Sequence, residues 1–354
     1  MSVVTYKCPN CGASLVFDPE SGMFACDYCL SKFSQEEFSQ SAQPEEEEVY
    51  ENPEVSENGS EESAAMLYHC PNCGAEIITD ETTAATFCFY CHHPLVLSGR
   101  LEGKYLPDGI ITFQYTKEQA IAKFQQWIQG KKFIKKGFYS PNQVEKMTGV
   151  YFPYWLYSCE TDNHITGTSK HVTVTRVGDL EHTETKVYQI SRSASVDFRY
   201  VPRNALTKAQ SDLLKGIFPF EFGAMKKFRM EFLAGFQAEK RDVEKEGIRQ
   251  GIRQNVAAHA KTRMKNTVSS QQQFSLSNQI CNIEKEQFHY VMLPVWILTY
   301  KDVLGKQYYF AMNGQTGEVA GKLPVNKLKI NLFTAAVFFG VFILALMLFG
   351  GGVA

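Results

Sequence analysis

Two cysteine-rich repeats, a middle region of mixed helix and strand patterns, and an uncharged C-terminal segment set the fold class of this chain. Together they predict a multidomain protein with two small β zinc ribbons, an α+β body with antiparallel strands, and one C-terminal transmembrane helix. The expected boundaries are a zinc ribbon at 1–35, an acidic flexible linker at 36–65, a second ribbon at 66–99, the body at 100–326 and the helix at 327–350.

Charge divides the 354 residues into two unlike parts. Residues 1–99 hold 17 acidic and 2 basic side chains, a net of −15, whereas residues 100–354 hold 21 and 34, a net of +13. The overall net charge of −2 is the cancellation of these two values. Because phosphate binding rests on Lys and Arg, the N-terminal part is a poor candidate for a nucleic-acid surface.

The N-terminal region contains a tandem repeat, which governs its interpretation. Residues 7–33 and 69–95 both carry Cys-Pro-Asn-Cys-Gly-Ala, followed by Cys-x-Tyr-Cys. Four cysteines in each copy form the candidate metal ligands: Cys8, Cys11, Cys26 and Cys29 in the first, and Cys70, Cys73, Cys88 and Cys91 in the second.

Each set of four thiolates matches the soft tetrahedral ligand shell that Zn²⁺ prefers. Gly12 and Gly74 allow the backbone to curl after each first pair, and Asp18–Gly22 has the composition of a hairpin turn. Since protein thiolates fill all four positions, we expect two structural Zn²⁺ sites with no open position for catalysis. Metal binding would then supply folding energy to modules too small to fold alone.

Other uses of these cysteines fit the residues less well. Disulfides suit an oxidising compartment, and a redox Cys-x2-Cys usually occurs once. Cys88-Phe-Tyr-Cys91-His92 matches a haem-attachment pattern, but Leu30 replaces the histidine in the first repeat. Iron is compatible with the spacing, so the choice between zinc and iron stays open.

Four further residues in or near these patterns are expected to play no part in metal binding. With four cysteines available in each repeat, His92 and His93 should be exposed rather than ligands. Cys159 and Cys281 lie in strand-like stretches without a partner motif. We expect both to pack as small buried hydrophobes rather than to act as nucleophiles.

The segment between the repeats is rich in Glu, Ser, Asn and Gln, and no Lys or Arg occurs from Phe33 to Gly99. Such a composition cannot bury enough apolar area to offset the entropy of ordering the chain. We therefore expect a flexible acidic linker over residues 36–65.

Helical patterns open and close the body. Residues 116–130 and 239–264 carry apolar residues at helical spacing. Ser140-Pro-Asn-Gln143 is a capping box with proline at the first helical position, and residues 207–210 could open another helix. These segments predict an amphipathic helix near the start of the body and a long one before its last strands.

Strand patterns fill the rest of the body. Residues 151–201 are rich in Val, Thr, Tyr and Ile around a Gly178-Asp179 turn, and strands resume over 274–325 with Asn313-Gly314 as a hairpin turn. The segments 150–156 and 291–297 share a Pro-x-Trp-aliphatic pattern. They are either two related β elements or two unrelated aromatic strands.

Residues 330–349 contain no charged side chain, which predicts a transmembrane helix because about 20 apolar residues span a bilayer core. Lys322, Lys327 and Lys329 precede this segment, and no basic residue follows it. The positive-inside tendency places the N-terminal bulk in the cytoplasm. We expect a tail-anchored, single-pass protein of the cell membrane.

The sequence lacks the motifs of the common enzyme classes, so we expect no enzymatic activity. It has no phosphate loop, no dinucleotide-binding glycine pattern, no H-E-x-x-H and no G-x-S-x-G. A basic run in the last long helix could face phosphate, and it consists of Lys240, Arg241, Lys245, Arg249, Arg253, Lys261, Arg263 and Lys265. This run is the basis of an alternative function, a nucleic-acid-binding or transcription- or replication-linked protein tethered to the membrane.

The two Cys-Pro-Asn-Cys-Gly motifs, the Pro294-Val-Trp296 strand and the Asn313–Gly317 loop before Leu323-Pro324 also carry a family resemblance. On them the chain resembles bacterial membrane-anchored proteins with transcription-factor-IIB-type zinc ribbons, some labelled primosomal protein N′ or superfamily II helicase-like. The resemblance implies a cytoplasm-facing membrane protein linked with membrane-stress systems, such as phage-shock and flotillin-like proteins. The helicase label conflicts with the missing nucleotide-binding loop.

The expected function is therefore a non-enzymatic, zinc-binding membrane adaptor that presents its ribbons to an unidentified cytosolic or membrane protein. Its acidic part would be distal to the membrane and its basic part proximal, where acidic lipid attracts Lys and Arg. Nucleic acid is an unlikely partner, because the ribbons themselves offer little beyond Lys7 and Lys32.

Overall fold

The computed structural model describes residues 2–41, 45–48, 66–70, 76–79, 82–88, 93–97, 101, 103–135, 137–209, 211–268, 273–301 and 305–349. Cys73 and Cys91 of the second repeat lie outside this part of the chain, as do Gly74 and His92. Residues 49–65 of the expected linker also lie outside it.

One large, mostly antiparallel sheet runs through the molecule, in the order β13-β10-β15-β11-β14-β8-β9-β1-β5. β12 pairs with β11, and β16 and β17 continue from β15. The strands outside the repeats are β10 (Gly109–Ile110), β11 (Thr148–Val177), β12 (Leu180–Asn204), β13 (Lys226–Lys227), β14 (Gln237–Glu239), β15 (Gln273–Lys301), β16 (Gln307–Asn313) and β17 (Val319–Gly321). The antiparallel α+β body expected from the sequence is confirmed.

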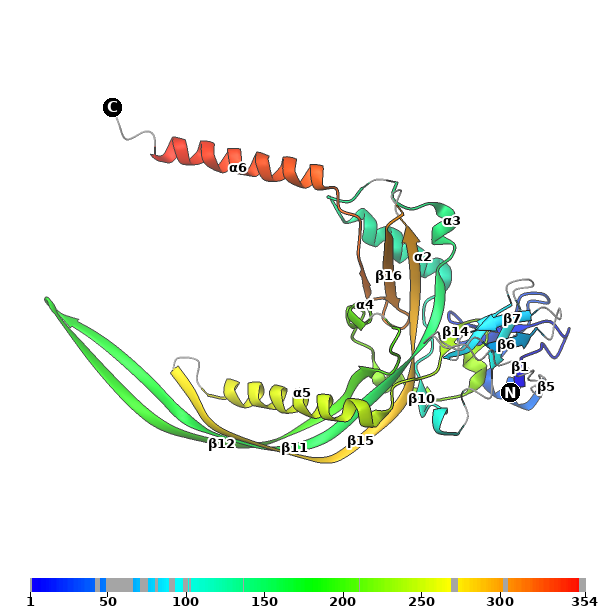
Figure 1. Ribbon diagram of the computed structural model, residues 1–354, viewed down its shortest axis with the longest axis horizontal. Helices are drawn as coiled ribbons and strands as arrows, with labels where there is room; N and C mark the ends of the chain where they lie inside the picture. The colour runs from blue at the N-terminus through cyan, green and yellow to red at the C-terminus, as the bar shows by residue number, and fades with distance from the viewer. Residues whose placement is uncertain are drawn as a thin grey trace, which may run out of the picture.

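Three of these strands are far longer than the rest and form a curved blade that projects from the body (Figure 1). We use "blade" for residues 157–201 of β11 and β12 together with residues 273–288 of β15. The expected Gly178-Asp179 turn joins β11 to β12 at the tip, and Gly178 has a φ of 61°. The repeats lie on the other side of the body from this tip (Figure 1).

Helix α5 (Lys245–Asn266) runs along the concave face of the blade (Figure 1). Its side chains Ile252, Val256, Ala260 and Met264, four residues apart, are all buried. The helix begins six residues later than the sequence pattern predicted. The reason is that Gln237–Glu239 is strand β14, which pairs with β11 and β8 and therefore cannot coil.

The body core is built around aromatic rings at the root of the long strands. Phe113 stacks on Phe236 with ring centres 4.2 Å apart, and Trp296 lies 5.0 Å from Phe113. Helix α2 (Lys117–Gln129) covers this end of the sheet with Phe124 fully buried. A capping box at Thr116 and Gln119 starts α2 where the sequence predicted.

The remaining helical segments of the body are short. They are α3 (Pro141–Val144), α4 (Ser211–Lys215), and the 3₁₀ turns η2 (Gly103–Tyr105), η3 (Phe222–Ala224) and η4 (Met230–Leu233). The expected capping box of Ser140 and Gln143 is present, but it starts only a single turn of helix. The helix expected to open at residues 207–210 is the short α4.

The hairpin turn predicted at Asn313-Gly314 is wrong in its detail. The Asn313 backbone N–H bonds to the Glu318 carbonyl, so the loop is longer, and Gly317 has the positive φ of 78°. The Asn313 amide is buried and donates to the Ile217 and Pro219 carbonyls. Asn313 therefore joins this loop to a distant segment of the chain. The Asn-Gly pair in the sequence indicates only a local turn and does not show this contact.

Residues 150–156 and 291–297, which share the Pro-x-Trp pattern, lie against each other as antiparallel neighbours in β11 and β15. Each tryptophan indole donates to a backbone carbonyl of another element, Trp155 to Val243 and Trp296 to Tyr115. The shared Pro-x-Trp pattern therefore lies on two paired strands, and the tryptophan of each strand makes the same kind of hydrogen bond. This favours the interpretation of the two segments as related β elements.

The chain continues from β17 into helix α6 (Lys327–Phe349). The Asn326 side-chain oxygen accepts the Lys329 N–H at its start. Residues 327–345 have a mean hydropathy of 2.0, and none of that surface is buried. Within the described residues, α6 is the one helix that is long and apolar enough to cross a membrane.

Part of the segment predicted to be a flexible linker has regular structure. Helix α1 (Gln35–Ser41) packs Phe38 against Phe24, with ring centres 4.8 Å apart. Strand β5 (Glu45–Glu48) pairs with β1 (Ser2–Thr5). Tertiary packing of one phenylalanine and an available strand edge explain this difference, because neither appears in the composition of the segment.

Candidate metal centre

The first repeat folds as a three-stranded sheet of β2 (Leu15–Asp18), β3 (Met23–Cys26) and β4 (Lys32–Phe33). The expected turn joins β2 to β3. In this turn the Gly22 N–H bonds to the Asp18 carbonyl at 2.9 Å, and the Ser21 hydroxyl donates to the Asp18 carboxylate at 2.6 Å. The hairpin returns Cys26 and Cys29 to the first cysteine pair.

Both Cys-x2-Cys segments form the same closed turn. In the first, the Gly12 N–H bonds to the Cys8 carbonyl at 2.8 Å; in the second, the Leu30 N–H bonds to the Cys26 carbonyl at 2.9 Å. Gly12 and Leu30 both have positive φ, 74° and 60°. This curl places the two sulfurs of each turn on one side of the backbone.

The four sulfurs of the first repeat converge, with every pair within 4.8 Å. Two pairs are closer, because Cys8 Sγ lies 3.5 Å from Cys29 Sγ and Cys11 Sγ lies 3.5 Å from Cys26 Sγ. Sulfurs bound to one tetrahedral Zn²⁺ at ~2.3 Å would be ~3.8 Å apart. The arrangement could therefore hold a metal ion with only small adjustments.

Ser31 is not one of the four cysteines, but it contacts Cys29 and changes the pKa of the Cys29 thiol. Its hydroxyl oxygen lies 3.2 Å from Cys29 Sγ, and hydrogen bonding of Cys29 with this hydroxyl and with the Ser31 backbone lowers the pKa of the Cys29 thiol to about 6. Burial instead raises the pKa of the Cys8 thiol. Because metal ligands must be thiolates, Ser31 favours the metal-binding form of Cys29. Its position five residues after Cys26 gave no signal in the sequence.

Aromatic packing fixes the first repeat to the body. Phe232 of η4 lies 5.5 Å from Phe17 and 6.2 Å from Phe24, measured between ring centres. The Phe17 N–H also bonds to the Ala234 carbonyl at 3.0 Å. The four-cysteine repeat is thus packed against the η4 segment of the body.

The second repeat is described in part. Cys70 and Cys88 are both buried, whereas their partners Cys73 and Cys91 lie outside the described residues. Its strands are β6 (Met66–His69), β7 (Glu76–Thr79), β8 (Thr83–Phe87) and β9 (Pro94–Leu97). Strands β7, β8 and β9 lie close to the repeat offset from β2, β3 and β4, but their pairing differs, because β7 pairs with β6 whereas β2 pairs with β3.

His93 connects the two repeats, and its predicted exposure is wrong. Its side chain is buried, with Nδ1 2.6 Å from the Ser14 hydroxyl, and its carbonyl accepts the Cys88 N–H. Strand β9 pairs with β1, and β8 pairs with β14 of the body. Strand β1, which precedes the first repeat, and β8 and β9 of the second repeat therefore continue the sheet of the body, whereas β2, β3 and β4 form a separate sheet.

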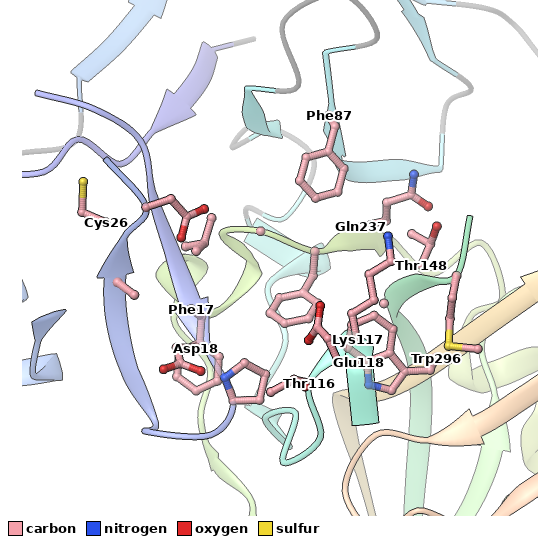
Figure 2. A pocket seen from close by; sticks show the side chains of 18 of the residues that line it. Phe17, Asp18, Cys26, Phe87, Thr116, Lys117, Glu118, Thr148, Gln237 and Trp296 are labelled. Carbon is pink, nitrogen blue, oxygen red and sulfur yellow. The ribbon is translucent and has the colours of Figure 1, made fainter. Parts of the chain in front are cut away.

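A cavity of about 740 Å³ opens beside the metal cluster, between the first repeat and the body. Figure 2 shows Phe17, Asp18 and Cys26 on one wall and Thr148, Gln237 and Trp296 on the other. Lys117 and Glu118, at the start of α2, project between these walls (Figure 2). A mixed apolar and charged opening of this kind can receive side chains of another protein.

The other sequence candidates lie away from the metal cluster. Cys159 is buried and Cys281 partly buried on the α5 side of the blade, as expected for packing residues. The basic run does not form one phosphate-facing surface. Arg241 is buried among Tyr105, Trp155 and Tyr290, with guanidinium-to-ring distances of 4.9 to 5.3 Å, and Arg249 and Arg253 both contact Glu286.

Comparison with known proteins identifies a relative of the whole chain. The uncharacterized protein YdjG of Bacillus subtilis (strain 168) is 28% identical over 355 residues, which cover 99% of each chain. No protein-family model matches the sequence. No solved structure matches either. The class defined by the fold and site is therefore a protein with a four-cysteine cluster that could bind metal and an apolar helix that could span a membrane.

Proposed function

We propose that this chain is a non-enzymatic membrane adaptor whose cysteine repeats bind two structural Zn²⁺ ions and contact a protein partner. In this proposal α6 is a single-pass anchor and the remaining described residues face the cytoplasm. The resemblance to membrane-anchored zinc-ribbon proteins favours a bacterial membrane-stress assembly as the setting.

The convergence of Cys8, Cys11, Cys26 and Cys29 carries this proposal. Four thiolates complete a tetrahedral shell and leave no position for water or substrate, so the metal would act on folding rather than on chemistry. Two large apolar side chains at the cluster are exposed, Tyr28 to 82% and Leu30 to 81%. Apolar side chains held outward by a rigid turn suit contact with another protein.

The cavity beside the cluster supports the same role. It lies where the first repeat meets the body, and its wall includes Cys26 itself. Loss of the metal would therefore alter the wall of this cavity as well as the fold of the first repeat. The position of α6, remote from the repeats in Figure 1, would leave this surface accessible above a membrane.

Affinity capture from detergent-solubilised membranes, with metal measured on the same sample, tests the proposal. The full chain should recover a specific partner and about two zinc per chain. The double variant Cys8→Ser/Cys70→Ser should lose both, while Cys281→Ser, a cysteine outside the repeats, should lose neither. Unchanged partner recovery by the double variant, at an equal membrane level, would exclude the repeats from the mechanism.

The nucleic-acid alternative is weaker in this proposal. Three of its eight basic residues, Arg241, Arg249 and Arg253, are committed to contacts within the chain. DNA binding measured against salt concentration distinguishes the two functions, since phosphate contacts give a steep salt dependence. Binding that weakens steeply between 50 and 200 mM salt would favour the alternative.

A further inference from the structure

The outer edge of β12 is a long, unprotected strand edge. β12 pairs with β11 on one side, and no strand of the described chain lies on the other. Every second residue of such an edge presents a backbone N–H and C=O outward. Proteins normally cover, shorten or interrupt an edge of this length, because it is a template for pairing with another strand.

The tip of the blade is the least supported part of this edge. We use "tip hairpin" for residues 171–186, beyond the last pairing of β11 with β15 at Lys170 and Gln273. Here only two strands remain, and Val174, Val177 and Leu180 are 55%, 72% and 79% exposed. A two-stranded hairpin is marginally stable in water, so the tip hairpin requires further strands.

We propose that the outer edge of β12 pairs antiparallel with the same edge of a second copy of this chain. A two-fold axis perpendicular to the sheet relates the copies, so each contact occurs twice. The tip hairpin then becomes part of a four-stranded sheet, in the order β11-β12-β12-β11. The proposal does not depend on the function proposed above.

Contacts between opposite charges favour one register of this pairing. In the register that places Glu184 of one copy opposite Arg192 of the other, Tyr188 lies on the axis and Leu180 faces Val196. The ladder then spans roughly 55 Å. The opposite charges meet twice, and Tyr188 meets its own copy as a favourable aromatic pair.

A second register also brings opposite charges together, and its axis lies two residues further along β12, which moves every pairing by four residues. It would place Ile190 on the axis and Glu181 opposite Arg199. Both of those charges already have partners within the chain, Glu181 with Arg176 at 3.6 Å and Arg199 with Asp197 at 3.7 Å. In the Tyr188-centred register Glu184 also has a partner, Lys186 at 3.3 Å, whereas Arg192 makes no ion pair within the described residues. The shifted register therefore gains less from charge than the Tyr188-centred register.

Charge exchange in the full chain tests the pairing, measured as oligomeric mass in mild detergent by sedimentation. The unmodified chain should be dimeric. Glu184→Arg and Arg192→Glu should each weaken the dimer by ~10-fold or more, and the combined variant should restore it. The proposal would be overturned if the unmodified chain were monomeric. It would also be overturned if the two single variants and the combined variant all formed dimers as stable as that of the unmodified chain.

Cross-linking tests the register independently. The two-residue turn makes Tyr188 a non-hydrogen-bonded position on the outer edge, where facing Cα atoms are ~4.5 Å apart, within disulfide range. Tyr188→Cys should cross-link on mild oxidation above the level of the unmodified chain, whereas Lys186→Cys and Ile190→Cys should not. A mixture of the latter two should cross-link, because these positions face each other. Cross-linking of Ile190→Cys alone would refute the Tyr188-centred register.

Discussion

Gly12 and Leu30 occupy the same position in the two cysteine turns of the first repeat, and both adopt the left-handed backbone conformation, with φ of 74° and 60°. Glycine adopts this conformation without strain, whereas an L side chain with a Cβ does not. The side chain of Leu30 is 81% exposed, so packing in the core does not explain why a leucine occupies this position. An unfavourable residue at an exposed turn is consistent with a contact made outside the chain.

The turn itself gives the first prediction. Leu30→Gly should raise the free energy of unfolding by about 0.5–1 kcal/mol, because relief of strain exceeds the entropy cost of glycine. Gly12→Ala should lower it by about 1 kcal/mol for the opposite reason. Chemical denaturation of the full chain in detergent, followed by circular dichroism, measures both. A loss of stability in Leu30→Gly would show that the side chain packs within the chain.

Ser31 gives a prediction about pH. Its hydrogen bonds lower the pKa of the Cys29 thiol to about 6, so the thiolate and the bound metal persist to lower pH. In Ser31→Ala this pKa should rise, and the metal should be released at a higher pH with ~10-fold weaker affinity at neutral pH. Ser31→Thr, which keeps a hydroxyl, should restore most of the effect. Metal release followed with a chromogenic chelator across pH 4–8 measures this, and identical release curves would contradict it.

Arg241 gives a prediction about the body. Its buried guanidinium contacts three aromatic rings, the Lys104 carbonyl and the Glu244 carboxylate. Arg241→Lys keeps the charge but loses the planar contacts, and should cost about 2–4 kcal/mol of unfolding free energy. Lys245→Met, an exposed residue at the start of α5, should cost less than 0.5 kcal/mol. Equal midpoints of denaturation for the two variants would refute this role.

The same contact predicts the pH dependence of stability. The hydrogen bond from Arg241 lowers the pKa of Glu244 below its usual value. A carboxylate with a lowered pKa contributes stability above its unfolded pKa of ~4.3, and this contribution disappears as the pH falls through the folded value. Glu244→Gln should therefore destabilise the protein at pH 7 and have little effect near pH 3. Denaturation midpoints at the two values test the difference, and equal effects would contradict it.

Helix α6 gives the fifth prediction. Val337 and Ile343 are both about half exposed on this apolar helix. Arginine at the centre of a spanning helix costs ~3 kcal/mol per residue, so Val337→Arg/Ile343→Arg should move the chain from alkali-washed membranes to the soluble fraction. Val337→Ile/Ile343→Val, which exchanges the two side chains, should remain in membranes. Retention of the arginine variant in the membrane pellet would show that α6 is not the anchor.

The local features of the fold and the candidate site follow from sequence because they depend on neighbouring residues. The cysteine spacing predicted the first sulfur cluster, the Asp18–Gly22 composition predicted its hairpin, and the helical spacing of apolar residues over 116–130 predicted α2. Each of these depends on contacts within about 20 residues. The run of residues 330–349 likewise predicted α6, because apolar length alone defines such a helix.

The incorrect details concern side chains whose partners are distant in sequence. Asn313 anchors a loop to residues 94 and 96 positions earlier, and His93 meets Ser14 from the other repeat. The expected flexible linker contains α1 because Phe38 packs on Phe24. A sequence pattern does not show which distant residues will meet. Local residue propensity therefore placed these side chains in a turn or in solvent.

The sequence by itself determined the first four-cysteine cluster, the antiparallel character of the body and the apolar C-terminal helix, since spacing and hydropathy act locally. The tertiary structure decided that β1 and the second-repeat strands β8 and β9 join the sheet of the body through β14, and that three strands extend into a blade. It also placed Arg241 inside an aromatic enclosure rather than on a basic surface. These outcomes depend on which strand edges and rings meet after folding, and that choice is set by the free energy of packing across the whole chain.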